Sequence, residues 1–183
     1  QQLLTGKKRL PGFSGEWEIE QLGNIADLHR QSVYPANFPE TTFTHYSLPA
    51  FDDKQHPVIE LGIAIKSSKF LIPQDAVLVS KLNPRIPRVW LPHNADINAV
   101  SSTEFLILTP KENISRSFLF MLCSSPVFYE KMELSATGTT GSHQRINPGD
   151  ALKIQLQLPI DFKEQTAIAA VLSDMDAEIA ALE

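Results

Sequence analysis

The segment that most constrains the fold of this chain is residues 76–91, with the sequence AVLVSKLNPRIPRVWL. Apolar, β-forming residues at its two ends, 76–79 and 89–91, predict two short strands. The loop between them contains two prolines, each of which fixes φ and removes a backbone donor, so we expect a stiff connection. The segment therefore predicts a β-hairpin with a rigid loop.

The loop of this hairpin is basic and polar. Its candidate ligand-binding side chains are Lys81, Asn83, Arg85 and Arg88. Three cations beside an amide side chain suit a polyanion whose base edges are read, because cations contact phosphate while amides and guanidinium groups pair with bases. The alternative is a solvated hairpin whose charges only keep the chain soluble, and from this loop alone it is the simpler interpretation.

Composition narrows the class of protein. Hydrophobic residues make up 43% of the 183 residues and charged residues 20%, as in globular domains. Thirteen prolines and eight glycines imply many turns, which favours a sheet-rich core. The net charge of −5 argues against a uniformly basic nucleic-acid-binding chain but permits one basic face. The single Cys123 excludes an internal disulfide and, with no apolar run long enough to span a bilayer, favours a cytoplasmic location.

Between residues 14 and 160 the pattern predicts short strands and helices in alternation. We expect strands at 42–48, 105–108 and 153–158, a strand and then a turn within 16–26, and helical segments at 117–122 and 127–134. Residues 29–57 lack clear periodicity and predict a long irregular region with one strand. The predicted fold class is α+β, with a mixed, twisted β-sheet, short helices and a long C-terminal helix of coiled-coil type.

Helical signals stand at both ends of the chain. Residues 1–13 predict the end of a helix that stops at Gly6, with the following three cations complementing the helix dipole. At the other end, Asp161 and Glu164 resemble a capping box that opens a helix over 162–183. Apolar residues spaced four, three, four and three apart form a heptad seam in this helix: Ile168, Leu172, Met175, Ile179 and Leu182. The seam favours a coiled coil with another helix, and the alternative is an amphipathic helix packed on its own domain.

A second polar loop spans residues 136–146, ATGTTGSHQRI. It lacks the lysine that a Walker-type phosphate loop requires after its last glycine. Its side chains that match a polyanion are Ser142, His143, Gln144 and Arg145. No histidine or cysteine cluster has metal-ligand spacing, and no cofactor fingerprint or complete catalytic motif is present. The sequence therefore predicts a chain without catalytic residues, metal or cofactor.

Taken together, these segments resemble part of the specificity subunit of type I restriction-modification enzymes. The opening residues 1–13 are similar to the end of that subunit's conserved helical spacer. The resemblance covers nearly the whole chain in the right order and is carried by 17–25 (WEIEQLGNI), 80–92 (SKLNPRIPRVWLP), 101–108 (SSTEFLIL), 138–146 (GTTGSHQRI) and 158–172 (LPIDFKEQTAIAAVL).

The resemblance implies a division of the chain and a function. Residues 1–13 would be the end of a preceding spacer helix, 14–160 one target recognition domain, and 161–183 the start of a spacer helix. Such a domain reads one half of a bipartite site in double-stranded DNA. Partner methyltransferase (M) and restriction (R) subunits then methylate adenine and cleave DNA, and the spacer helix joins a second target recognition domain or a second copy of the chain.

Two other functions remain open at this level. The chain could be an interaction or assembly module that acts through the C-terminal heptad helix, with both polar loops as solvated surface. It could also be a stand-alone methyltransferase or nuclease, although the missing cofactor and metal motifs argue against an enzyme.

Overall fold

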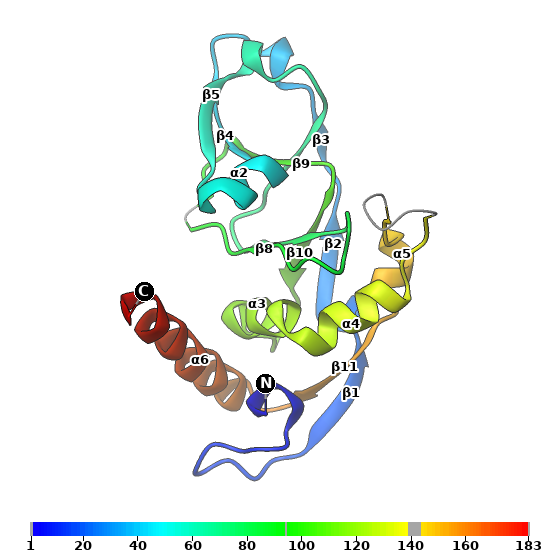
Figure 1. The fold of residues 1–183 in the computed structure, drawn as a ribbon, viewed down its shortest axis with the longest axis vertical. Helices are drawn as coiled ribbons and strands as arrows, with labels where there is room; N and C mark the ends of the chain where they lie inside the picture. The colour runs from blue at the N-terminus through cyan, green and yellow to red at the C-terminus, as the bar shows by residue number, and fades with distance from the viewer. Residues whose placement is uncertain (1, 94, 139–143, 183) are drawn as a thin grey trace.

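The computed structural model describes residues 2–93, 95–138 and 144–182, which form an elongated molecule with three small sheets along its length (Figure 1). A five-stranded sheet lies at one end, a four-stranded sheet in the middle and a two-stranded sheet at the other end. Helices α3, α4 and α6 (Arg116–Ser124, Pro126–Leu134 and Phe162–Leu182) gather in the half of the molecule that holds both termini. The predicted α+β class with a long C-terminal helix is confirmed.

The four-stranded sheet is antiparallel and is built around the predicted hairpin. Its order is β2 (Ala26–His29), β10 (Phe105–Pro110), β7 (Val77–Ser80) and β8 (Val89–Trp90). Strands β7 and β8 pair directly, and every residue of β7 is buried. Burial on both faces explains why residues 76–79 read as a continuous apolar run rather than as an alternation.

The five-stranded sheet has the order β3 (Ser32–Val33), β6 (Lys69–Leu71), β9 (Ala99–Ser102), β4 (Thr42–Tyr46) and β5 (Val58–Leu61). Its β4–β9 pair is parallel and the others are antiparallel.

The expectation of a long irregular region at 29–57 with one strand is wrong in part. Besides β4, this region contains β3, the 3₁₀ turn η2 (Pro35–Asn37) and the helix α2 (Leu48–Lys54). Helix α2 is under two turns long, so periodicity could not reveal it. It begins at Ser47, whose side chain accepts a hydrogen bond from the Ala50 backbone N–H, with Pro49 in the first turn.

Serine side chains cap the starts of α3 and α4. The Ser115 side chain accepts from the Phe118 backbone N–H at the start of α3, and Ser125 plays the same part for α4. Cys123, on α3, is fully buried, and burial raises the pKa of its thiol. The expected turn at Gly23–Asn24 is instead the one-turn helix α1 (Leu22–Ile25). The remaining short elements are η1 (Leu3–Thr5), η3 (Gly62–Ala64) and α5 (Pro148–Ala151).

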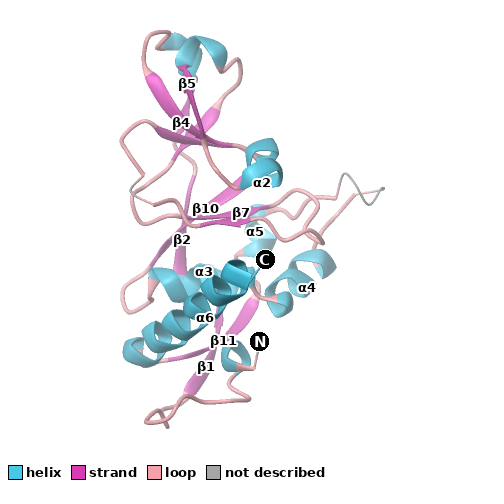
Figure 2. Cartoon of the chain, turned by 60° about the vertical axis from the view of Figure 1, so that its left-hand side comes forward, coloured by secondary structure: helices cyan, strands magenta, loops and turns pink. Residues whose placement is uncertain are grey.

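The two-stranded sheet joins β1 (Trp17–Gln21) to β11 (Gln155–Pro159) in antiparallel register. The strictly alternating burial of 155–158 confirms the strand predicted from the KIQLQL pattern. Helix α6 follows β11 directly and packs against α3, as Figure 2 shows from the side.

The predictions of a capping box at the start of α6 and of the role of Arg9 need correction. Asp161 Oδ1 accepts a hydrogen bond from the Lys163 backbone N–H, so it caps the helix. Glu164, however, does not close a capping box, because its carboxylate is 1% exposed and holds Arg9 at 2.6 Å. Arg9 therefore pairs with α6 rather than with the dipole of the preceding helical turn. Gly6 ends that turn at φ 67°, as predicted from its position.

The heptad seam divides into two parts. Ile168 is buried and Leu172 packs partly against the core of its own domain. Met175, Ile179 and Leu182 are 53%, 57% and 88% exposed. In the part of the chain that the structure describes, no helix is long and apolar enough to cross a membrane.

Candidate nucleic-acid interface

The described parts of the two polar loops lie side by side and are joined through their backbones. The Asn83 N–H donates to the Gln144 carbonyl at 2.8 Å, and the Ile146 N–H donates to the Lys81 carbonyl at 3.1 Å. Leu82 and Arg145 form an isolated antiparallel bridge. Residues 81–83 of the hairpin loop and residues 144–146 thus lie side by side, although they lie about 60 residues apart in the sequence.

The hairpin loop is held rigidly. The Ser80 hydroxyl accepts a hydrogen bond from the Leu82 backbone N–H and donates to the Leu82 carbonyl. Asn83 has φ 52°, and its carbonyl accepts from the Ile86 N–H at 3.0 Å, which closes a turn. Asparagine tolerates this left-handed conformation better than most residues. Asn83 therefore shapes the loop, and the residue as a whole is 9% exposed.

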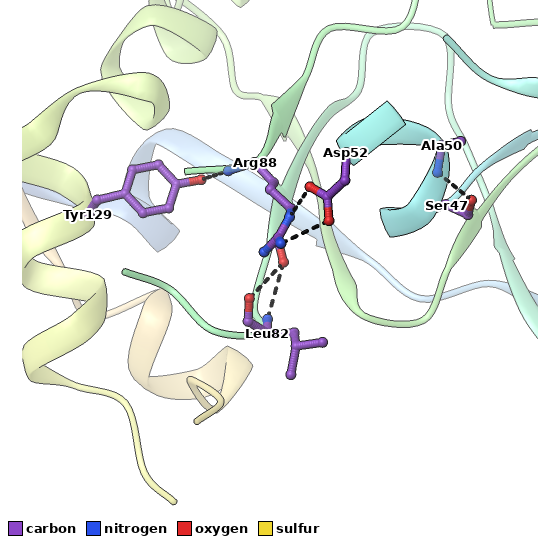
Figure 3. Close-up of polar contacts among 7 residues, drawn as sticks. Ser47, Ala50, Asp52, Leu82, Arg88 and Tyr129 are labelled. Atoms are coloured by element: carbon purple, nitrogen blue, oxygen red, sulfur yellow. Dashed lines mark hydrogen bonds and ion pairs between the residues drawn. The ribbon is translucent and has the colours of Figure 1, made fainter. Parts of the chain in front are cut away.

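Arg88 is held from two sides. Its Nε and Nη2 donate to Asp52 Oδ1 and Oδ2 at 2.6 and 2.9 Å, and its backbone N–H donates to the Tyr129 hydroxyl at 2.9 Å. Figure 3 shows both contacts, with Asp52 on α2 and Tyr129 on α4. Burial raises the pKa of the Tyr129 phenol, so this hydroxyl stays neutral. The Arg88 side chain is 12% exposed and Asp52 is 50% exposed.

Arg145 forms a looser pair with Glu104. Its Nε lies 3.1 Å from Glu104 Oε2 and its Nη2 lies 3.3 Å from Oε1. The two side chains are 47% and 27% exposed. An ion pair this exposed contributes about 0–1 kcal/mol to stability. The carboxylate holds Arg145 at the surface without removing it from solvent.

Arg85 and Lys81 are the least constrained cations of the hairpin loop. Arg85 is exposed and donates from Nε to the Asn83 side-chain carbonyl at 3.1 Å. Within the described residues, Lys81 Nζ has no hydrogen-bond acceptor or ion-pair partner. Gln144 joins the hairpin through its backbone and is half-buried, whereas Ser142 and His143 lie outside the described residues.

Asp52 is the residue of this surface that sequence reasoning missed. It lies on α2, inside the region that we expected to be irregular, and 36 positions from the arginine that it contacts. No local signal could have found it, because the contact depends on how α2 packs on the hairpin. Elsewhere in residues 2–93, 95–138 and 144–182, no three His, Cys, Asp or Glu side chains lie close enough together to hold a metal ion.

Solved structures share this fold. A chain from a study of complex assembly and conformational transition in the type I R-M system matches with 23% identity and a TM-score of 0.75, covering 96% of this chain and 45% of its own. The HsdS subunit from Thermoanaerobacter tengcongensis matches with 20% identity and a TM-score of 0.76, with 96% and 44% covered. The S subunit from M. genitalium gives 17% identity, a TM-score of 0.65, and coverage of 97% and 43%.

These solved chains show the fold alone, and the class of protein follows from a family model. The sequence model of the type I restriction modification DNA specificity domain matches residues 14–183, so the chain belongs to that family. Membership in this family makes the chain a recognition component rather than a catalytic one, and the resemblance drawn from its motifs is confirmed. The chain spans less than half the length of the solved chains that it matches. No curated protein sequence matches it.

Proposed function

We propose that this chain reads one half of a bipartite site in double-stranded DNA through the surface formed by residues 81–88 and 144–146, which we call the joined-loop surface. The observation that carries the proposal is the backbone pairing of the two loops. It gathers four cations, Lys81, Arg85, Arg88 and Arg145, on a chain of net charge −5. Asp52 and Glu104 offset the charges of Arg88 and Arg145, whereas Lys81 and Arg85 have no carboxylate partner among the described residues, so a polyanion would stabilise this cluster of like charges.

The cations differ in the contacts that they are suited to make. Lys81 is a point charge without a described partner and suits a phosphate, which fixes the position of the protein on the duplex. Arg85 is exposed and presents a planar fork that matches the O6 and N7 atoms of guanine. The joined-loop surface thus combines the two kinds of contact that sequence-specific binding requires.

Replacing Arg85 by alanine is expected to weaken binding to a preferred duplex. If Arg85 reads guanine, the loss should be about 1–3 kcal/mol and specificity should relax at one base pair. If Arg85 contacts phosphate, binding should fall evenly across sequences and the salt slope should shrink by about one unit. Lys81→Ala should show the phosphate behaviour. The measurement is fluorescence anisotropy over a range of salt concentrations, with duplexes first selected by the wild-type chain from a random library.

The matched control is Lys163→Ala, which removes one exposed positive charge in the first turn of α6. It should leave affinity and salt slope close to wild type. Unchanged affinity, site preference and salt slope in folded Arg85→Ala and Lys81→Ala proteins would refute the DNA-reading function of this surface.

The same proposal assigns a role to each segment of the chain. Residues 14–160 would be one target recognition domain, 161–183 the start of a spacer helix and 1–13 the end of a preceding one. The Arg9–Glu164 pair supports this division, because it holds the first helical turn beside the start of α6. In the assembled enzyme, methyltransferase and restriction subunits would methylate adenine and cleave DNA where this domain directs them.

A second function, assembly through α6, is favoured by the exposed half of the heptad seam. Ile168 is 1% exposed, whereas Met175, Ile179 and Leu182 are all more than half exposed. One domain thus covers only the first part of the seam. A second helix, from another target recognition domain or a second copy of the chain, would cover the rest.

Ile179→Asp is expected to weaken association through α6 while leaving the melting temperature unchanged, because Ile179 is 57% exposed. Sedimentation of the free chain and pull-down with the methyltransferase subunit measure the loss. Leu172→Asp is not a clean test, since Leu172 also packs on its own core. Identical sedimentation and docking of wild type and Ile179→Asp would contradict the assembly role.

A further inference from the structure

The Arg88–Asp52 pair is difficult to explain by stability alone. The Asp52 carboxylate is half exposed, so solvent screens its charge and the pair contributes little to stability. A half-exposed carboxylate beside a surface that gathers cations also repels any polyanion that approaches. The pair nevertheless has two short hydrogen bonds, at 2.6 and 2.9 Å, with the geometry of a preorganised contact.

Contacts with the rest of the fold hold both Asp52 and Arg88 in place. Helix α2 is clamped to β8, because Trp90 Nε1 donates to the Gln55 carbonyl at 3.2 Å and the Phe51 ring meets the Trp90 ring edge-on at 5.2 Å. The backbone of Arg88 is held separately by the Tyr129 hydroxyl on α4. The guanidinium therefore has one defined orientation before any ligand arrives.

The way in which Asp52 contacts Arg88 leaves one edge of the guanidinium available. Asp52 takes the edge formed by Nε and Nη2, so the edge formed by Nη1 and Nη2 remains. Among the described residues, Nη1 has no hydrogen-bond acceptor. Glu104 takes the same Nε–Nη2 edge of Arg145. On this one surface, two arginines are thus each fixed by a carboxylate along the same edge.

The Arg9–Glu164 pair provides the contrast. It uses the same edge of the guanidinium, but Glu164 is 1% exposed and also lies 3.4 Å from Trp17 Nε1. That carboxylate is buried in the fold and joins two segments of the chain. Asp52 is 50% exposed, and within the described residues its carboxylate contacts only the arginine of the joined-loop surface.

We propose that Asp52 is a specificity-determining positioning residue, which holds the Arg88 guanidinium so that its Nη1–Nη2 edge reads one base pair of the DNA site. The O6 and N7 atoms of a guanine would accept hydrogen bonds from this Nη1–Nη2 edge. This inference rests on the proposed function of the joined-loop surface. It adds a residue from a helix that lies outside both polar loops.

The experiment uses the full chain and a duplex selected by the wild-type protein from a random library. For each variant, the affinity for this duplex is divided by the affinity for duplexes that carry one substituted base pair. Asp52→Asn should lower this ratio about tenfold at one position, because the arginine is no longer held. Asp52→Glu keeps the carboxylate and should restore part of the ratio. Arg88→Lys should lose the ratio at the same position, and Asp52→Asn should add no further loss in that background.

The matched control is Asp53→Asn, which removes the same charge from the neighbouring exposed residue of α2. Loss of either negative charge should raise non-specific affinity by a similar factor, but only Asp52→Asn should change the ratio. An unchanged ratio in Asp52→Asn, with or without a lower melting temperature, would overturn the positioning role. A wild-type chain that prefers no duplex, or Arg85→Ala and Lys81→Ala variants that bind normally, would instead overturn the proposed function and this inference with it.

Discussion

Replacing Arg9 by methionine is expected to lower the free energy of unfolding by about 3 kcal/mol, a large share of the stability of a domain of this size. Methionine keeps most of the side-chain length over the Trp17 ring, which the Arg9 guanidinium faces at 5.6 Å. The substitution leaves the Glu164 carboxylate 1% exposed and without its cation. A buried charge that loses its partner costs far more than the pair itself contributes. Urea denaturation followed by circular dichroism measures the loss.

The two ends of this pair should respond unequally. Glu164→Gln removes the buried charge and leaves Arg9, which is 28% exposed, in contact with water, so the loss should be about 1–2 kcal/mol. The double variant should be more stable than Arg9→Met alone, because it contains no unpaired buried charge. Lys8→Met is the control, since Lys8 is exposed and adjacent, and it should fall within about 0.5 kcal/mol of wild type. Equal effects of Arg9→Met and Lys8→Met would show that the pair does not join residues 1–13 to α6.

Sequence patterns predicted the helices and strands that are determined by residues within one short segment. The hairpin β7–β8 follows from two apolar runs around a proline loop, and β11 follows from strict alternation. The start of α3 follows from Ser115, whose hydroxyl caps the helix as its position indicates. The end of the first helical turn follows from Gly6 in the same way. In each case, the residues that predict the element and the residues that form it lie in the same short segment.

Contacts between distant segments were the ones that sequence could not predict. Glu164 stands where a capping box requires a glutamate, yet it pairs with a residue 155 positions away. The two polar loops were identified from their side chains, but their backbone pairing depends on the position of β7 in the sheet. Asp52 was missed because α2 has too few residues for a periodic pattern. The cations of the joined-loop surface and the pairing of an arginine with Glu104 were thus predictable from chemistry, and Asp52 was not.

Gly62 is the clearest case of a residue whose importance only the fold reveals. In the sequence it is one glycine among eight, in a segment without a turn motif. In the structure, η3 begins at Gly62 and packs against η2, and the Gly62 N–H donates to the Thr41 carbonyl at 2.8 Å. A Cβ atom at this position would overlap the backbone carbonyl oxygens of Phe38 and Pro35. Neither contact can be relieved by rotating a side chain, because both oxygens belong to the backbone.

Gly62→Ala should therefore destabilise the protein by about 3 kcal/mol, at the upper end of the cost of overpacking, because η2 and η3 must separate to admit one methyl group.

Substitutions at two other glycines separate the cost of overpacking from the cost of backbone strain. Gly15 has open space and no left-handed φ, so Gly15→Ala should be neutral or stabilising by up to about 1 kcal/mol. Gly12 has open space but φ 87°, so Gly12→Ala should show the cost of backbone strain alone, about 1 kcal/mol. Thermal unfolding measures the stabilities of the three variants. A Gly62→Ala protein as stable as the Gly15→Ala protein would show that η2 and η3 are not in close contact. Close packing is the expected result, because this contact closes the β4–β5 end of the five-stranded sheet, where sequence periodicity gives no guidance.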